Sequence, residues 1–226
     1  MQTDISDLAL LVENAYIGAM AEGRTRRWGA GKAAMVRHLY ATLEPATQVD
    51  LAAHAGVSQP AVSQYLSSLR ANGDVSFEDP GWLANRAQLP ASYWHSYASR
   101  FASESCWYRI DNVTAQVGDL VERQPELIVS GDVAADAVLP WKVPAVAIVY
   151  GSVEDSAMDE LGFVHADTAA TATVLVRPMP DDSFASDALD VRVMRVAAHL
   201  HLVADLIGLG GDDRLEAVER FASVVQ

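Results

Sequence analysis

The chain has 226 residues, of which 50% are hydrophobic, and a formal net charge of -14 at pH 7, so it can fill the cores of two ordinary domains. It contains no apolar run of about 18 residues, and Asp4 and Asp7 stand where a signal peptide would carry basic residues. We therefore expect a soluble, cytoplasmic protein that does not enter a membrane, and the single cysteine, Cys106, excludes an internal disulfide and a thiolate zinc cluster.

Residues 1–29 are predicted to form a helix followed by a basic arm. Apolar residues recur at helical spacing over 7–20, which indicates a helix that packs on the next domain or on its copy in a dimer. Arg24, Arg26 and Arg27 then form the densest basic run of the chain. This run is either a solvated linker or an arm that contacts phosphate groups.

Residues 30–90 are predicted to form a winged helix-turn-helix. Within 48–72, Gly56 can adopt the left-handed conformation that ends a helix over 48–55, and Ser58 can cap the helix that follows. An earlier helix over 32–43 would complete the core. The inward stripe of the second helix is formed by apolar residues at helical spacing, namely Val62, Leu66 and Leu69.

The opposite face of that second helix carries short amide and hydroxyl side chains. Amides can bind adenine edges bidentately and hydroxyls can contact bases or phosphates, so this face suits the major groove of DNA. The alternative is that two short helices merely pack together. The residues that we expect to contact DNA are Ser58, Gln59, Ser63, Gln64 and Ser67 on the helix, Arg24, Arg26 and Arg27 in the arm, and Lys32 and Arg70.

Two short strands, over 75–77 and 82–84, are predicted to form the wing around a turn at 78–81. The turn carries Glu78 and Asp79, so we expect the wing to add little affinity for phosphate. Residues 24–70 hold 6 basic and 2 acidic side chains, whereas 91–226 hold 9 basic and 21 acidic. Because the basic footprint is small, we expect modest non-specific binding and a homodimer that uses two footprints.

Residues 91–226 are predicted to form a mixed α+β domain, which makes the whole chain α+β. An aromatic-faced linker helix is expected to begin at Leu89 and to reach Phe101. The remaining patterns predict strands over 107–110, 126–129, 146–150 and 171–177, helices over 112–123, 132–138, 154–161 and 192–209, and a final helix over 212–224.

Two segments resemble a known family. ELIVSGDVAADAVLPWKVPAVAIVY, at 126–150, resembles the opening of the carboxyl-terminal domain of actinobacterial antitoxins of the abortive-infection AbiEi type, and 203–221 is similar to that family's final helices. This resemblance implies an antitoxin of a type IV toxin-antitoxin system that represses its own operon. It also implies a nucleotidyltransferase-like toxin as partner. Separately, SQPAVSQYLSSLRANG, at 58–73, resembles the recognition helix of metal-responsive ArsR-type repressors.

Other function classes stay open as alternatives. The turn at 149–152 is similar to the Gly-Ser turn of nucleotidyltransferases, but no two carboxylates stand two positions apart anywhere in the chain, as a two-metal site on a strand requires. A ligand-responsive repressor would need a pocket, for which we considered Trp107, Trp141 and Tyr150. The six histidines show no ligand spacing. We expect a regulator that binds double-stranded operator DNA, with no catalytic residues, no metal and no cofactor.

Overall fold

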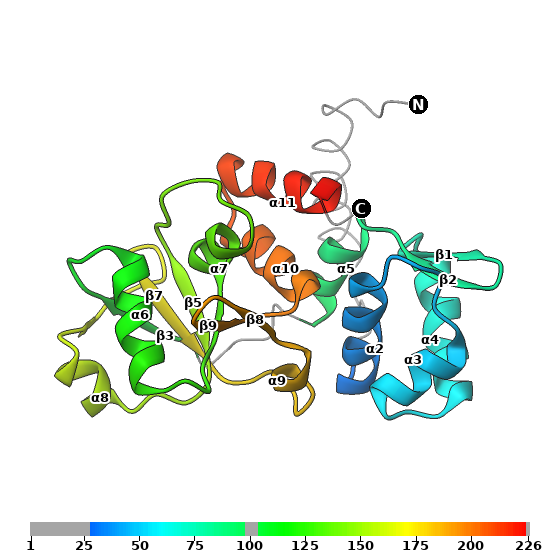
Figure 1. Cartoon of the computed structure of the whole chain (residues 1–226), viewed down its shortest axis with the longest axis horizontal. Coiled ribbons are helices and arrows are strands. Elements are labelled where there is room, and N and C mark those ends of the chain that lie inside the picture. The colour runs from blue at the N-terminus through cyan, green and yellow to red at the C-terminus, as the bar shows by residue number, and fades with distance from the viewer. Residues whose placement is uncertain (1–27, 98–103, 225–226) are drawn as a thin grey trace. The chain divides into compact units, whose positions relative to one another are not determined.

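The computed structural model describes residues 28–97 and 104–224, which belong to two compact units (Figure 1). The first unit combines 1–99 with 199–226, and the second comprises 100–198. This division differs from the expected boundary between 90 and 91, because the carboxyl-terminal helices pack with the amino-terminal half. The predicted helix at 7–20, the arginines Arg24, Arg26 and Arg27, and the residues around Phe101 lie outside the described residues.

The first unit contains helices from both ends of the chain and a hairpin of two antiparallel strands. Its helices α3, α4 and α11 match the predicted segments, while the linker helix ends at Ser96. The described elements are α2 (Ala30–Ala41), α3 (Gln48–Ala55), α4 (Gln59–Ala71), β1 (Val75–Glu78), β2 (Gly81–Ala84), α5 (Leu89–Ser96), α10 (His199–Leu209) and α11 (Asp212–Val224).

Local signals account for the turn between α3 and α4. Gly56 adopts a left-handed φ of 62° and ends α3. Ser58 is the N-cap residue of α4, as predicted, but its hydroxyl makes no capping bond; its carbonyl accepts a hydrogen bond from Val62 N at 3.1 Å. The side-chain cap is at α3 instead, where Thr47 Oγ1 accepts from Asp50 N at 3.2 Å.

Helix α10 belongs to the first unit because it packs on α5, α11 and α2. A buried chain of polar side chains joins three of these helices. Arg37 Nη1 on α2 donates to the Tyr93 hydroxyl on α5 at 3.2 Å, and that hydroxyl lies 3.0 Å from His201 Nδ1 on α10. His201 Nε2 in turn lies 3.6 Å from the Asp205 carboxylate. Since all four side chains are buried, this network fixes how the helices meet.

The second unit is built around a sheet. The described elements are β3 (Ser105–Tyr108), α6 (Val113–Arg123), β4 (Ile128–Ser130), α7 (Gly131–Val138), β5 (Ala147–Tyr150), α8 (Asp155–Glu160), β6 (Val164–His165), β7 (Val174–Arg177), α9 (Phe184–Asp187), β8 (Leu189–Val191) and β9 (Met194–Val196). Together with the first unit, these elements confirm a mixed α+β protein.

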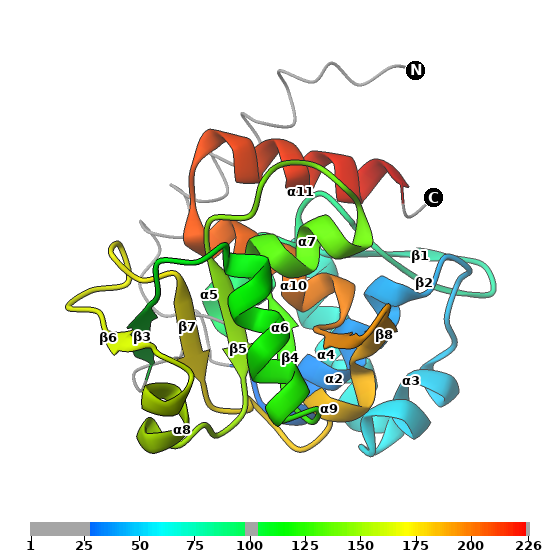
Figure 2. The same cartoon turned by 60° about the vertical axis from the view of Figure 1, so that its left-hand side comes forward.

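Over the described residues, the sheet has seven strands in the order β6-β3-β7-β5-β4-β9-β8. The pairs β5/β7 and β4/β9 are parallel and the others are antiparallel. Helices α6 and α7 pack against β5, and α7 also packs against β4 (Figure 2). Every residue of β4, β5 and β7 is buried, which explains why these strands read as continuous apolar runs.

The helix predicted over 192–209 is wrong in its first part. Residues 194–196 form β9, which pairs with β8, and α10 begins only at His199. Arg192 lies in the turn of this hairpin with φ of 55°. Apolar and polar residues alternate over Asp190–Arg192, which is typical of a strand. The sequence analysis predicted a helix here because the long apolar run of α10 follows directly.

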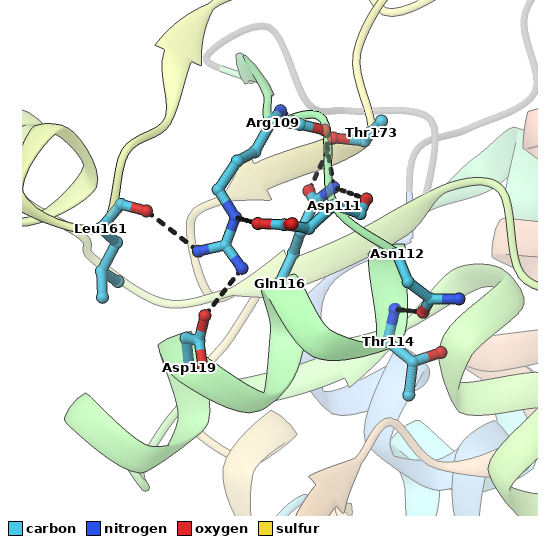
Figure 3. A network of polar contacts seen from close by, with 8 residues as sticks. All are labelled: Arg109, Asp111, Asn112, Thr114, Gln116, Asp119, Leu161 and Thr173. Atoms are coloured by element: carbon cyan, nitrogen blue, oxygen red, sulfur yellow. Dashed lines mark hydrogen bonds and ion pairs between the residues drawn. The ribbon is translucent and has the colours of Figure 1, made fainter.

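A partly buried arginine, Arg109, ties the end of β3 to α6 and to the turn after α8 (Figure 3). Arg109 Nε lies 2.9 Å from Asp111, Nη2 donates to Asp119 at 2.7 Å, and Nη1 donates to the Leu161 carbonyl at 2.9 Å. The guanidinium also lies 5.0 Å from the ring centroid of Phe163. One side chain therefore holds two carboxylates, a carbonyl and an aromatic ring.

Within the described ranges, no helix combines the length and the apolar character needed to cross a membrane.

Candidate nucleic-acid interface

The outer face of α4 is the surface on which the predicted contact residues meet. Apolar Val62, Leu66 and Leu69 have no exposed surface and direct one side of the helix into the core. The other side is left to solvent because the packing of the helix is already satisfied. Its predicted contact residues are all exposed: Ser58, Gln59, Ser63, Gln64, Ser67 and Arg70.

The hydrogen-bonding capacity of this face is largely unused by the fold. Ser67 Oγ donates to the Ser63 carbonyl at 2.8 Å, which leaves its oxygen able to accept. The Ser58 hydroxyl makes no cap bond. Short amides and hydroxyls with exposed donors and acceptors can bind the edges of bases in a groove wide enough for a helix.

Lys32 does not lie on this surface. Its side chain is buried in α2, and Nζ lies 4.2 Å from the centroid of the Trp28 ring. Burial lowers the pKa of Lys32 to about 8, against a smaller opposing attraction from Asp74. A phosphate contact by Lys32 is therefore incompatible with this position, and the predicted role is corrected: the residue packs in the core of the first unit.

The hairpin beside α4 has a third backbone partner that the sequence interpretation missed. Ala46 N donates to the Trp82 carbonyl and Trp82 N donates to the Ala46 carbonyl, both at 2.9 Å. Gly81 permits this approach, because a Cβ there would lie 2.7 Å from the backbone of Ala46. The only sequence signal for this contact was the glycine at the first position of β2.

The hairpin exposes an aromatic residue and two carboxylates. Phe77 is 49% exposed and meets Trp82 edge to face, with ring centroids 5.4 Å apart. Glu78 and Asp79 at the tip are exposed. The tip of the hairpin therefore presents carboxylates to solvent.

Two histidines that are distant in the sequence come together next to the turn. The rings of His38 on α2 and His54 on α3 are stacked, with centroids 4.0 Å apart. Among the described residues, no group of three or more His, Cys, Asp or Glu side chains is placed to hold a metal ion.

His199 lies at the start of α10, and its ring contacts the ring of Phe221. Burial lowers the pKa of His199.

The aromatic residues considered for a ligand pocket do not line one together. Trp107 is buried and stacks on His165, and Tyr150 is buried. Lys142 Nζ lies 4.4 Å from the centroid of the Trp141 ring. A cavity does occur in the second unit, beside the turn at Gly151.

The acidic residues considered for transfer chemistry lie in α8, where Asp159 and Glu160 are exposed. Glu160 forms an ion pair with Arg123 of α6. Adjacent residues on a helix point in different directions, so these two carboxylates do not form the paired arrangement of a two-metal site.

Comparison of the chain with protein-family models, curated proteins and solved structures finds no match.

Proposed function

We propose that residues 30–84 form a winged helix-turn-helix and that the protein is a sequence-specific DNA-binding regulator of transcription. The observation that carries this proposal is the exposed face of α4. Its amide and hydroxyl side chains are exposed, and the buried stripe on the opposite side fixes the orientation of the helix in the unit. A helix presented in this way suits the major groove.

The order of elements supports the winged form. A backbone bridge at Ala46 stands between α2 and α3, and β1 and β2 follow α4 directly. Pairing of Ala46 with Trp82 makes the hairpin part of the same small sheet. Since the hairpin tip is acidic, base contacts by α4 and phosphate contacts elsewhere carry the binding.

In this proposal Arg70 and the arginines at 24, 26 and 27 contact the phosphate groups. Arg70 is exposed in the last turn of α4. With Lys32 buried, the basic footprint is smaller than the composition of 24–70 implies. Affinity for phosphate scales with the number of contacts, so we propose a homodimer that places two recognition helices on two half-sites of an operator.

The resemblance to AbiEi-type antitoxins supports a more specific role. In this role the protein represses its own operon and its second unit engages a nucleotidyltransferase-like toxin. Residues 104–198 hold 6 basic and 16 acidic side chains. A partner that handles nucleotides carries a basic site, to which such a unit is attracted electrostatically.

Base readout by α4 is tested on a duplex selected from random DNA by the wild-type protein. Gln59→Ala and Gln64→Ala should each cost about 1 to 3 kcal/mol of discrimination at the contacted base pair, because a bidentate amide contact is lost. Affinity for random duplexes should barely change.

Ser68→Ala is the matched control, since Ser68 is exposed on α4 but lies at the edge of the proposed face. Equal losses on the selected and the random duplexes would remove the recognition role from Gln59 and Gln64. An unchanged selected sequence in a Gln59→Ala, Gln64→Ala double variant would do the same.

A further inference from the structure

The hairpin of the first unit has a free edge on its outer strand. β1 pairs with β2 in antiparallel register, with Phe77 opposite Trp82. Trp82 uses both of its backbone groups on the other side of β2, where its N–H and C=O bond to Ala46 at 2.9 Å. Hydrogen-bonded and non-hydrogen-bonded pairs alternate along an antiparallel ladder, so Phe77 and Trp82 form a non-hydrogen-bonded pair. The N–H and C=O of Phe77 therefore point away from β2.

Another extended segment can reach this edge. Among the described residues, β1 has β2 as its ladder partner and no second strand beside it. Native sheet edges are commonly blocked by lysine or proline, but β1 contains neither, and the three residues after Val75 are exposed. Figures 1 and 2 show the hairpin projecting from the helices of this unit.

An aromatic pair lies beside the free edge. Phe77 is 49% exposed, and its ring meets that of Trp82 edge to face with centroids 5.4 Å apart. Residues directly opposite each other in an antiparallel pair share one face of the sheet. Aromatic side chains bury much apolar surface with few rotatable bonds and are enriched in binding hot spots. This face of the hairpin can therefore anchor an apolar side chain.

The end of the hairpin is acidic. Glu78 and Asp79 are exposed, and residues 71–85 contain no lysine or arginine to neutralise them. A second copy of β1 would bring its own Glu78 and Asp79 to this edge, and like charges across a strand pair are destabilising. Charge complementarity therefore favours a basic partner over a second copy of the chain.

We propose that the free edge of β1 binds an extended segment of another protein in which apolar residues alternate with lysine or arginine. The segment adds as a strand and exchanges backbone hydrogen bonds with Phe77. Side chains of successive strand residues lie on opposite faces, so an alternating segment places an apolar residue beside Phe77 and a basic one beside Glu78. This inference goes beyond the proposed DNA-binding function and does not rest on it.

The test measures binding of labelled peptides to the full chain by fluorescence anisotropy at low ionic strength. The probe is a peptide of alternating lysine and valine with about seven residues, the length of an ordinary strand. It should bind saturably. The same peptide with glutamate in place of lysine should not bind, because its charges repel Glu78 and Asp79.

Two substitutions of Phe77 separate the backbone contact from the ring. Phe77→Pro removes the outward N–H and the ring but no ladder hydrogen bond, so it is tolerated on an edge strand. It should weaken binding of the lysine peptide at least about tenfold. Phe77→Ser keeps the N–H and should weaken binding about threefold or more. Val49→Ser is the matched control, because Val49 is 62% exposed on α3, and it should leave binding unchanged.

The charge is tested by Glu78→Lys, which should weaken binding of the lysine peptide at least about fivefold by replacing attraction with repulsion. Glu122→Lys is its matched control. It makes the same change in net charge at an exposed residue of α6 in the second unit, so binding should stay within about twofold of wild type.

Several results would overturn the proposal: no binding of the lysine peptide at millimolar concentration, equal binding of the glutamate peptide, equal losses in Glu78→Lys and Glu122→Lys, or binding that survives both changes of Phe77. A homodimer that Phe77→Pro disrupts in sedimentation equilibrium would assign the edge to a second copy instead. Loss of DNA affinity in Phe77→Pro without peptide binding would assign the hairpin to DNA. The peptide assay contains no DNA, so failure of the proposed DNA-binding function does not change its result.

Discussion

Lys32 shows how burial changes the role of a charged residue. In the sequence it belongs to a basic segment before the helix-turn-helix. In the structure it is 7% exposed, with its ammonium over the Trp28 ring. A cation over an aromatic face recovers part of the cost of leaving water, which explains how a lysine can be accommodated in this core. The basic surface of the first unit is correspondingly smaller.

The lowered pKa of Lys32 predicts a pH-dependent stability. Its pKa falls from 10.5 to about 8 on folding, so between these values the unfolded chain binds more protons than the folded one. Linkage then requires the free energy of unfolding to rise with pH over this window, while the full cost of burial is present below about pH 8.

Lys32→Met removes the buried charge and keeps the length of the side chain. We expect a gain of about 1 to 3 kcal/mol in the free energy of unfolding at pH 7, from the avoided desolvation. The loss of Lys32's attraction for Asp74, whose pKa is raised by burial, offsets part of this gain. Denaturant unfolding at pH 7 and above pH 10.5 measures the effect.

The gain in the free energy of unfolding from Lys32→Met should shrink toward zero above pH 10.5, because Lys32 of the wild-type protein is itself neutral there. Lys142→Met is the control at the other lysine, which lies 3.9 Å from the Asp132 carboxylate, and it should not stabilise. A gain from Lys32→Met that persists undiminished at high pH would show that packing, not the charge, is responsible.

The glycines inside α6 and α10 have different surroundings. Gly118 in α6 has open space where a Cβ would stand, whereas a Cβ on Gly208 in α10 would lie 2.2 Å from the Trp94 ring. Glycine inside a helix costs roughly 0.5 to 1 kcal/mol relative to alanine. At Gly208 the absence of a side chain allows α10 to pack closely on α5, which offsets this cost. At Gly118 no close contact offsets it.

The same substitution should therefore have opposite signs in the two helices. Gly118→Ala should raise the free energy of unfolding by about 0.5 to 1 kcal/mol through the lower entropy of the unfolded chain. Gly208→Ala should lower it by about 1 to 3 kcal/mol, the usual cost of overpacking. Thermal and urea unfolding of both variants decide the matter, and a stabilising Gly208→Ala would contradict the packing of α10 against Trp94.

At the scale of the molecule, the first unit is assembled from two separate segments, while the second is continuous. Helix α10 packs on α5 and α2 and shares a buried polar network with them. A fragment of 1–99 lacks these partners. A fragment of 100–198 keeps every strand pair of its sheet.

We expect 100–198 to fold alone and 1–99 to remain unfolded or to aggregate. Joining 1–99 to 199–226 through a flexible Gly/Ser linker of about ten residues should restore cooperative unfolding, because α10 again covers α5. Circular dichroism and urea titration of the three fragments provide the measurement. Cooperative folding of 1–99 by itself would show that α10 and α11 are dispensable for this unit.

The sequence by itself determined the elements whose signals are local. Gly56, the Ser58 cap position and the apolar stripe of α4 lie within a few residues of one another, and α3 and α4 begin and end where predicted. The strands β4, β5 and β7 were readable for the same reason, as short buried runs between turns. The exposed face of α4 follows directly from its stripe.

Only the tertiary structure decided which elements share a core. The sequence interpretation assigned α10 and α11 to the second domain, because nothing near His199 shows that its partners lie before residue 97. The burial of Lys32, the pairing of Ala46 with Trp82 and the position of Arg177 at a cavity likewise depend on residues far along the chain. Caps and periodicity act within a few turns of backbone, whereas burial and strand pairing depend on contacts that form only when distant segments meet.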